Sequence, residues 1–424
     1  MKADPLGARK GAVRLILAAL ERGEMLDEAA LPDGLPGPDR ARALSLARAT
    51  MRWLGPADAV LARFLKRPPD APARAILRLG AVEMLALDAA PHGVVDACVE
   101  MAKARRETAK LSGLVNAVLR KVADQGAEIW DGLDNARLAA PDWFWRQLRA
   151  DWGKDVARAI VTEQLNAPPL DLTVRADATG WAQRLGGKVT PNGSVRLMRP
   201  GRITELEGYA AGDWWAQDAA AATAARLAGA GEGRRALDLC AAPGDKTMQL
   251  AAAGWSVTAL DASASRMERV KENLARTNLS AELVTADALE WKVDQPFDLV
   301  LLDAPCTSTG TVRRHPELPH IRDGGGADAA AVLQSRLMAA AWTMVAPGGR
   351  MIYATCSLNR AEGEAQAASF LAAHPEAERI PVTPEEVGGE ALITRQGDYR
   401  ARPDLWAEIG GMDGFFACRI GKPS

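Results

Sequence analysis

The chain has 424 residues, of which 48% are hydrophobic and 25% are charged. This length and composition are those of a globular protein with about two to four domains, which excludes a single small module, a disordered chain and a fibrous rod. Lysine and arginine number 52 against 54 aspartates and glutamates, and this near balance excludes binding to nucleic acid through bulk positive charge alone.

The charge is unevenly distributed along the chain. Residues 1–120 contain 19 basic and 14 acidic side chains, whereas the remainder contains 33 basic and 40 acidic ones. The mildly basic front end is compatible with a polyanionic partner, and equally with ordinary solvated helix faces.

The cysteines do not form a disulfide framework or a metal site. They are Cys98, Cys240, Cys306, Cys356 and Cys418, with no CxxC pair, and the chain has only four histidines. No uncharged apolar stretch is long enough to span a bilayer, and no cleavage-site pattern follows the basic N-terminal segment. We therefore expect a cytoplasmic protein with free thiols.

Residues 1–126 are predicted to form one helical domain. Apolar residues recur with a helical period, and breakers at Gly34–Gly37, Pro68–Pro69, Pro91 and Ser112–Gly113 divide the segment into about six helices. Residues 127–212 are predicted to be a helical linker followed by a small α+β subdomain. Strand-like alternation in that subdomain occurs at 171–175 and 194–198.

Residues 213–424 are predicted to be an α/β domain. Apolar strands alternate there with helices such as Ala264–Asn278, and this alternation is typical of a parallel sheet wrapped by helices. The predicted strands are Arg235–Cys240, Ser256–Asp261, Ala281–Asp287, Phe297–Asp303 and Arg350–Thr355.

A loop of small residues joins the first of these strands to a helix. It reads Cys240-Ala241-Ala242-Pro243-Gly244-Asp245-Lys246. Ligands of open α/β sheets bind beyond the carboxyl ends of the strands, so we expect a cofactor at this loop. The loop lacks both the GxGxxG pattern of dinucleotide sites and the P-loop pattern, which disfavours NAD and nucleoside triphosphates.

Acidic residues end the next three predicted strands. They are Asp261, Asp287 and Asp303, whose carboxylates can accept hydrogen bonds from ribose hydroxyls or an adenine amine. Taken singly, each is equally well a helix cap or a loop residue. Together, and without a phosphate-cradling loop, they favour S-adenosylmethionine, which carries ribose and adenine but no phosphate.

Two cysteines follow the fourth and fifth predicted strands. We expect Cys306 and Cys356 to lie beside the cofactor, and the other three cysteines to be buried structural residues. A thiolate that adds to carbon 6 of cytosine makes carbon 5 nucleophilic enough to attack a methyl sulfonium. Asp303 can hydrogen-bond to the ring as charge develops there.

The sequences ALDLCAAPGDKT, LDAPCTSTG and YATCS resemble the motifs of the NOL/NOP/Sun family of RNA cytosine-5 methyltransferases. Residues 79–85 and 112–120 also resemble the NusB-like RNA-binding domain that precedes the catalytic core in bacterial ribosomal-RNA members. The resemblance implies a Rossmann-like S-adenosylmethionine methyltransferase core, preceded by an all-α NusB-like domain and a small α+β insert.

The resemblance also implies roles for individual residues. Cys356 is the implied nucleophile, Cys306 assists release of the methylated base, and Asp303 contacts the cytosine. The residues implied to hold S-adenosylmethionine are Cys240, Ala241, Ala242, Pro243, Gly244, Asp245, Lys246, Asp261, Asp287 and Asp303, and those implied to contact RNA are Arg313 and Arg314. Asp245 stands where the family usually has a second glycine, and its charge lies near the expected position of the cofactor carboxylate.

We therefore expect a monomeric enzyme that methylates carbon 5 of a cytosine in RNA, with 16S ribosomal RNA as the substrate. No metal and no membrane partner are expected. One alternative is an RNA-binding ribosome assembly factor that no longer turns over, which the intact cysteine pair disfavours. A second is a methyltransferase that acts on protein, which gives no reason for two cysteines at the cofactor edge.

Overall fold

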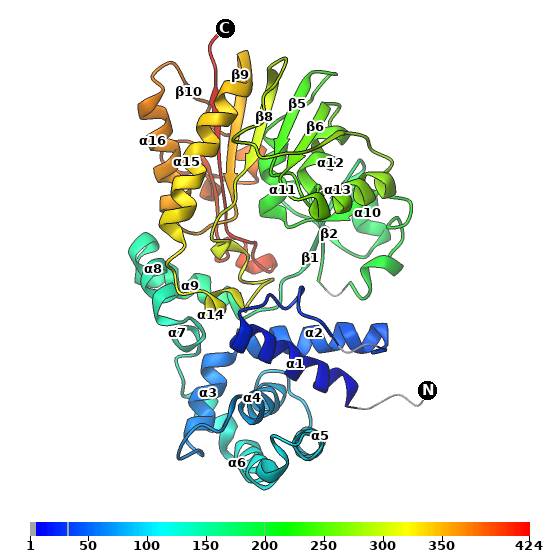
Figure 1. The fold of residues 1–424 in the computed structure, drawn as a ribbon, viewed down its shortest axis with the longest axis vertical. Coiled ribbons are helices and arrows are strands. Elements are labelled where there is room, and N and C mark those ends of the chain that lie inside the picture. Colours follow the sequence, from blue (N-terminus) through cyan, green and yellow to red (C-terminus); the bar gives the residue numbers. More distant parts are fainter. Residues whose placement is uncertain (1–5, 32–33, 199) are drawn as a thin grey trace. The chain divides into compact units, whose positions relative to one another are not determined.

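The computed structural model describes residues 6–31, 34–198 and 200–424. The chain divides into two compact units (Figure 1). The helical unit comprises the chain up to Ala167 together with Val312–Gly324, and the catalytic unit comprises Pro168–Thr311 and Gly325–Ser424. This division differs from the predicted boundaries after residues 126 and 212, because the helices that follow residue 126 pack with the helical unit and the small sheet belongs to the catalytic unit. Residues 1–5 of the predicted front domain lie outside the described residues.

The first six helices of the helical unit share an apolar core. Leu15, Ile16, Ile76, Leu79 and Leu119 are fully buried in it. The helices are α1 (Gly7–Arg22), α2 (Gly37–Arg52), α3 (Leu54–Ala62), α4 (Ala71–Leu85), α5 (Pro91–Lys103), α6 (Ser112–Asp131), α7 (Asn135–Ala139), α8 (Asp142–Trp152), α9 (Lys154–Gln164) and α14 (Leu318–Ile321).

Most helix ends coincide with the breakers in the sequence. Pro91 occupies the first position of α5, where its missing N–H leaves no hydrogen bond unmade. Gly23 ends α1 in the left-handed region, with φ of 69°. Ser112 and Gly113, predicted to be a break, instead form the first turn of α6, because the short 3₁₀ turn Ala109–Leu111 already separates it from α5.

Val312–Gly324 belongs to the helical unit although it lies in the middle of the catalytic sequence, and we call it the returning segment. Arg52 donates a hydrogen bond to the carbonyl of Arg313 at 2.7 Å, and Trp143 Nε1 donates to the carbonyl of Pro319 at 2.9 Å. The segment begins shortly after Cys306, so its packing in the helical unit constrains the chain just beyond a cysteine of the candidate site.

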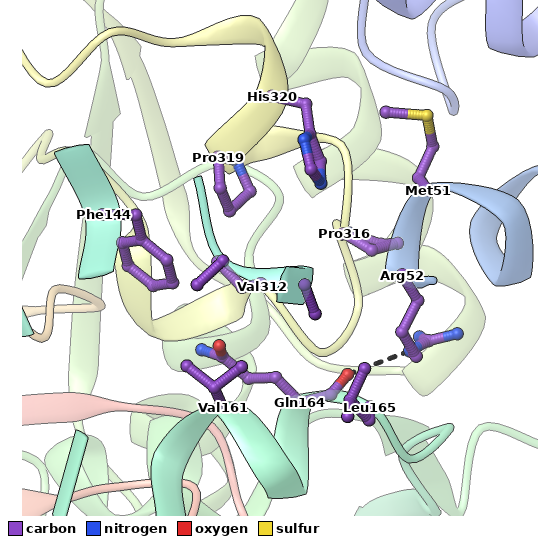
Figure 2. Close-up of a pocket in the computed structure, with 12 residues that line it drawn as sticks. Met51, Arg52, Phe144, Val161, Gln164, Leu165, Val312, Pro316, Pro319 and His320 are labelled. Carbon is purple, nitrogen blue, oxygen red and sulfur yellow. Dashed lines mark hydrogen bonds between the residues drawn. The ribbon is translucent and has the colours of Figure 1, made fainter. Parts of the chain in front are cut away.

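The returning segment closes a small cavity of about 20 Å³ within the helical unit. Figure 2 shows the segment's side chains facing helical residues across it, and also the hydrogen bond from Arg52 to the Gln164 carbonyl, which is 3.0 Å long. The labelled residues around the cavity are Met51, Arg52, Phe144, Val161, Gln164, Leu165, Val312, Pro316, Pro319 and His320. Apolar side chains from both sequence regions therefore share this part of the core.

The catalytic unit begins with a small antiparallel sheet in the order β2-β3-β1-β4. Its strands are β1 (Leu170–Val174), β2 (Lys188–Val189), β3 (Val195–Leu197) and β4 (Trp214–Ala216), with α10 (Ala178–Arg184) beside them. Arg196 on β3 and Asp171 on β1 form a buried bidentate ion pair, with both N–O distances at 2.7 Å. The predicted strands at 171–175 and 194–198 correspond to β1 and β3.

A larger sheet follows, in the order β10-β12-β9-β8-β5-β6-β7, with β11 paired to β12. Strands β5 to β9 run parallel, whereas β12 is antiparallel to β9. The strands are β5 (Arg235–Leu239), β6 (Ser256–Asp261), β7 (Glu282–Thr285), β8 (Phe297–Asp303), β9 (Val345–Thr355), β10 (Glu378–Arg379), β11 (Tyr399–Ala401) and β12 (Phe415–Gly421).

Helices cover both faces of this sheet. Alternate residues of β8 show this, since they pack into two different apolar clusters. Leu299 and Leu301 lie in a cluster with residues of α11 and α12, whereas Val300 and Leu302 lie in a second cluster with residues of α15 and α16. The helices are α11 (Ala219–Arg226), α12 (Asp245–Ala252), α13 (Ala264–Thr277), α15 (Ala327–Met344), α16 (Glu364–Ala373) and α17 (Pro384–Val387) (Figure 1).

The strand order places a ligand site at the carboxyl ends of β5 and β8. From β5 the chain moves outward to β6 and β7, and then returns to the other side of β5 as β8. Such a reversal leaves a crevice between the two neighbouring strand ends, where open α/β sheets bind ligands. No helix among the described residues is long and apolar enough to cross a membrane.

Candidate active site

The predicted cofactor loop joins β5 to α12 at this reversal point. The backbone N–H of Ala241 donates to the Leu260 carbonyl at 3.1 Å, and that of Ala242 donates to Asp261 Oδ2 at 3.2 Å. Gly244 has φ of 104°, and a Cβ there would lie 3.1 Å from Val270 Cγ1. The loop is therefore held to β6 and packed closely against α13.

The three predicted strand-end acids lie along one edge of the sheet. Asp261 is largely buried at the end of β6, and its oxygens accept from the N–H groups of Ala242 and Ser263. Asp287 is exposed just beyond β7, and Asp303 ends β8. Each Asp261 oxygen retains a further lone pair, so its proposed role toward ribose hydroxyls is compatible with these contacts.

Lys246 and Asp303 form an ion pair between the cofactor loop and β8. Lys246 Nζ lies 2.6 Å from Asp303 Oδ2, and the two side chains are 10% and 28% exposed. Burial lowers the pKa of Lys246, but Asp303, Asp238 and Asp245 together outweigh burial and the pKa is raised. The sequence predicted both residues for the site but not their pairing.

Asp238 lies on β5 directly beneath the loop and was not predicted. It is fully buried, its Oδ2 accepts from Thr247 Oγ1 at 2.6 Å, and burial raises its pKa to about 7. Its Oδ1 has no hydrogen-bond partner in the part of the chain that the structure describes. A buried acceptor with a free position, together with strand-end carboxylates and no phosphate cradle, fits a cofactor that carries hydroxyl and amino donors.

Cys306 and Cys356 lie together after the neighbouring strands β8 and β9. Their Sγ atoms are 3.4 Å apart. The hydrogen bond from the Cys306 thiol lowers the pKa of Cys356, and the same contact raises the pKa of Cys306 well above its usual value. Cys356 is thus the member of the pair that is favoured as a thiolate.

The other three cysteines are suited only to structural roles. Burial raises the pKa of Cys98 and of Cys240 to about 12, and it raises the pKa of Cys418 well above its usual value. A thiol that stays protonated at neutral pH is a poor nucleophile. The geometry therefore separates the cysteine pair from the remaining cysteines.

Glu362 is a site residue that the sequence analysis missed. Its buried carboxylate accepts hydrogen bonds from Thr307 and Ser357, the residues that directly follow the two cysteines. No motif in the sequence marks it. The available signal was an acidic residue a few positions after Cys356, at a place where a solvated turn is equally expected.

Arg313 does not have the placement that was predicted for it. The side chain is fully buried in the helical unit, as part of the returning segment, and a buried guanidinium is not available to RNA phosphates. The predicted phosphate contact of Arg313 is therefore corrected to a structural role. Arg314 is half-buried, and its contact with RNA stays a prediction.

Comparisons with known proteins agree with this geometry. Residues 226–421 match the family model of 16S rRNA methyltransferase RsmB/F, and residues 7–124 match the NusB family. The chain is 35% identical over 401 residues to ribosomal RNA small subunit methyltransferase B of Xanthomonas campestris, covering 89% of this chain and 90% of that one. The corresponding protein of Pseudomonas putida is 33% identical over 96% of both chains. The chain belongs to the RsmB/F family of 16S rRNA methyltransferases.

Solved structures show the same fold. PH0851 is 22% identical and superposes over the full length of both chains with a TM-score of 0.74. A methyltransferase homologue from Pyrococcus horikoshii is 24% identical, with a TM-score of 0.55, and covers 65% of this chain and 93% of its own. The predicted fold class, a Rossmann-like core preceded by a NusB-like helical domain, is thereby confirmed.

As an RsmB/F methyltransferase, the protein uses S-adenosylmethionine as its cofactor. The predicted contacts of individual loop residues and strand-end acids with that cofactor stay predictions. Within the described ranges, no group of three or more histidine, cysteine or acidic residues could hold a metal ion.

Proposed function

We propose that this RsmB/F family member methylates carbon 5 of a cytosine in small-subunit ribosomal RNA through a covalent intermediate with Cys356. The cysteine pair, with its 3.4 Å separation beside Asp303 and the cofactor loop, carries this proposal. Methylation of a nitrogen or oxygen, which is already nucleophilic, needs no such pair. The names of the curated relatives support ribosomal RNA as the substrate.

In the proposed reaction, the Cys356 thiolate adds to carbon 6 of a cytosine extruded from its stack. S-adenosylmethionine supplies the methyl group that bonds to carbon 5. Asp303, held by Lys246, hydrogen-bonds to the ring while charge develops on it. A base then removes the carbon 5 proton, and the bond from Cys356 to carbon 6 breaks with its electron pair returning to sulfur. Cys306 assists this release.

A basic groove on the helical unit supports RNA as the partner. The groove has a volume of about 650 Å³ and an apolar floor that includes Val13, Leu17 and Ile76. Its charged lining residues are Lys10, Arg14, Arg22 and Arg105. None of the described residues that line it is acidic, although Arg22 pairs with Glu24 at 2.5 Å and Arg105 lies 3.9 Å from Glu107. Lys10 and Arg14 add positive charge to the groove, which suits the phosphate backbone of RNA.

Monomeric action in the cytoplasm stays a prediction.

Substitution of each cysteine tests the proposed mechanism. Cys356→Ala should abolish methylation and form no adduct with RNA. Cys306→Ala should methylate the base and then remain bonded to it through Cys356, giving a protein–RNA species that survives denaturing electrophoresis. Cys98→Ala, which removes a buried cysteine of the helical unit, serves as the matched control and should keep methylation without an adduct.

The possible results distinguish the alternatives. An adduct from Cys356→Ala and none from Cys306→Ala would exchange the roles of the two cysteines. Methylation intact in both variants would refute the covalent mechanism. A wild-type protein that binds ribosomal RNA but transfers no labelled methyl group would point to an assembly factor instead. Bisulfite sequencing of ribosomal RNA from a deletion strain would identify the modified cytosine.

A further inference from the structure

Glu362 is the most completely hydrogen-bonded side chain around the two cysteines. It ends the short 3₁₀ turn Arg360–Glu362, and its side chain is fully buried. Oε1 accepts from the Thr307 backbone N–H at 2.9 Å and from Gln334 Nε2 at 3.1 Å. Oε2 accepts from the Ser357 hydroxyl at 2.5 Å and from the Thr307 hydroxyl.

These donors tie together the two loops that carry the cysteines. Thr307 directly follows Cys306, and Ser357 directly follows Cys356. Gln334 on α15 also donates to the Pro305 carbonyl at 2.9 Å, so the network holds Cys306 from both sides. One carboxylate thus links two loops that are about 50 residues apart in the sequence. It adds to the direct bonds between these loops, such as that from the Gly310 N–H to the Cys356 carbonyl at 3.0 Å.

The negative charge of Glu362 affects the cysteine pair as well as its hydrogen bonds do. All four donors are neutral, and no salt bridge joins Glu362 to a cation within the described ranges. After the hydrogen bond to Cys356, burial and the charge of Cys356, the carboxylate of Glu362 contributes to the raised pKa of Cys306. The other charged and titratable groups around the cysteine pair are Asp303, Lys246, Tyr353 and Arg400.

We propose that Glu362 is a positioning residue that assigns the two cysteines their different roles, an inference that rests on the proposed function for the roles themselves. Its hydrogen bonds hold both loops so that the two Sγ atoms lie 3.4 Å apart. Its negative charge disfavours a thiolate on Cys306, and therefore leaves Cys356 as the nucleophile. Glu362 does not contact the molecules with which the cysteines react, so it acts on the cysteines only through the two loops that it holds.

Glu362→Gln tests this role because it keeps the size of the side chain and removes its charge and one acceptor. Alkylation by iodoacetamide, mapped by mass spectrometry across a pH series, should favour Cys356 in the wild type. In Glu362→Gln the ratio of Cys356 to Cys306 labelling should fall, with Cys306 labelled at lower pH than before. Methylation kcat should fall by roughly tenfold to a hundredfold, whereas KM for RNA should change less than about twofold.

Two further variants complete the experiment. Glu362→Asp keeps the charge, so it should retain the labelling preference while lowering kcat through the shorter reach. Glu378→Gln, on the exposed strand β10, is the matched control and should leave the labelling ratio and kcat unchanged. If Glu362→Gln fails to fold, Ser357→Ala removes one of the four donors to Glu362, together with the acceptor of the Asn359 N–H, and should shift the ratio in the same direction.

An unchanged labelling ratio in a folded Glu362→Gln or Ser357→Ala protein would overturn the proposal. The same holds if Glu362→Asp loses the preference as completely as Glu362→Gln. Labelling is measured without RNA, so it reports the effect of Glu362 on the two thiols even if the wild type methylates no cytosine. A wild-type protein that methylates no cytosine would refute the proposed function and leave the assignment of the thiols intact.

Discussion

Replacing Lys246 with methionine tests the ion pair that links the cofactor loop to β8. The change keeps an unbranched side chain, one atom shorter, and removes its charge, so Asp303 loses the Nζ that lies 2.6 Å away. The buried Asp238 beneath the loop also loses a nearby positive charge. We expect both lower stability of the catalytic unit and slower methylation.

The size of the stability loss follows from the burial of the pair. Breaking a fully buried ion pair costs about 3–5 kcal/mol, because one charge is left without a partner. Asp303 is 28% exposed, so water solvates part of its charge and we expect a loss of about 2 kcal/mol. For a unit of this size, that corresponds to a decrease in the unfolding temperature of about 4–8 °C.

The effect on catalysis follows from the charges around Cys356. Asp303 raises the pKa of Cys356, whereas Lys246 lowers it. Lys246→Met removes the lowering influence, so the Cys356 pKa should rise and the acid limb of the methylation rate should move to higher pH. Thermal unfolding followed by circular dichroism and a pH–rate profile with saturating S-adenosylmethionine measure the two effects.

Lys271→Met is the matched control for these measurements. Lys271 lies on α13, its side chain is 69% exposed, and its contact with Glu268 is 3.8 Å long. We expect its loss to change the unfolding temperature by less than about 2 °C, since an exposed ion pair along a helix contributes about 0.3–0.5 kcal/mol. A Lys246→Met protein with an unfolding temperature and pH profile like those of Lys271→Met would refute the reasoning.

Three further predictions concern single residues. Asp245→Gly should tighten S-adenosylmethionine binding by about fivefold or less in calorimetry. Because burial raises the pKa of Asp245 to about 6, this gain in affinity should shrink below that pH. Weaker binding would mean that the helix-initiating role of Asp245 dominates. Burial lowers the pKa of His320, in the cavity of Figure 2, to about 4. The folded state therefore binds fewer protons than the unfolded chain, so urea unfolding should show roughly 3 kcal/mol lost as pH falls from about 6.5 to 4. His320→Gln should remove this loss, and an equal slope in both proteins would contradict the prediction. Arg52→Met leaves the carbonyls of Gln164 and Arg313 without their donor, so hydrogen exchange across Val312–Gly324 should accelerate; unchanged exchange there would show that Arg52 does not hold the segment.

The packing of the returning segment changes what a truncation would test. From the sequence, residues 1–126 form a domain whose removal leaves a catalytic core that binds S-adenosylmethionine. In the structure, Val312–Gly324 packs against that domain, so the deletion would also expose buried residues just after Cys306. Point substitutions in the basic groove, such as Arg14→Gln, therefore separate RNA affinity from folding better than a deletion does.

The sequence by itself determined the fold class, and it predicted that the small-residue loop, the three strand-end acids and the cysteine pair lie at one edge of the sheet. Each of these is a local pattern, in which a strand, a loop and a helix are encoded within about 20 residues. Parallel strands carry their carboxyl ends to one edge of a sheet, so residues at successive strand ends meet there without any further information. This is why Cys306 and Cys356 could be placed together before the structure was known.

Only the tertiary structure decided which side chains are partners across long stretches of sequence. The pairing of Lys246 with Asp303, the contacts of Glu362 with both cysteine loops, and the burial of Arg313 all depend on which elements pack against each other. A local pattern fixes the backbone conformation and the face on which a side chain emerges, but the neighbour on that face belongs to another part of the chain. The returning segment is the clearest case, because its sequence lies between catalytic motifs while its buried surface belongs to the helical unit.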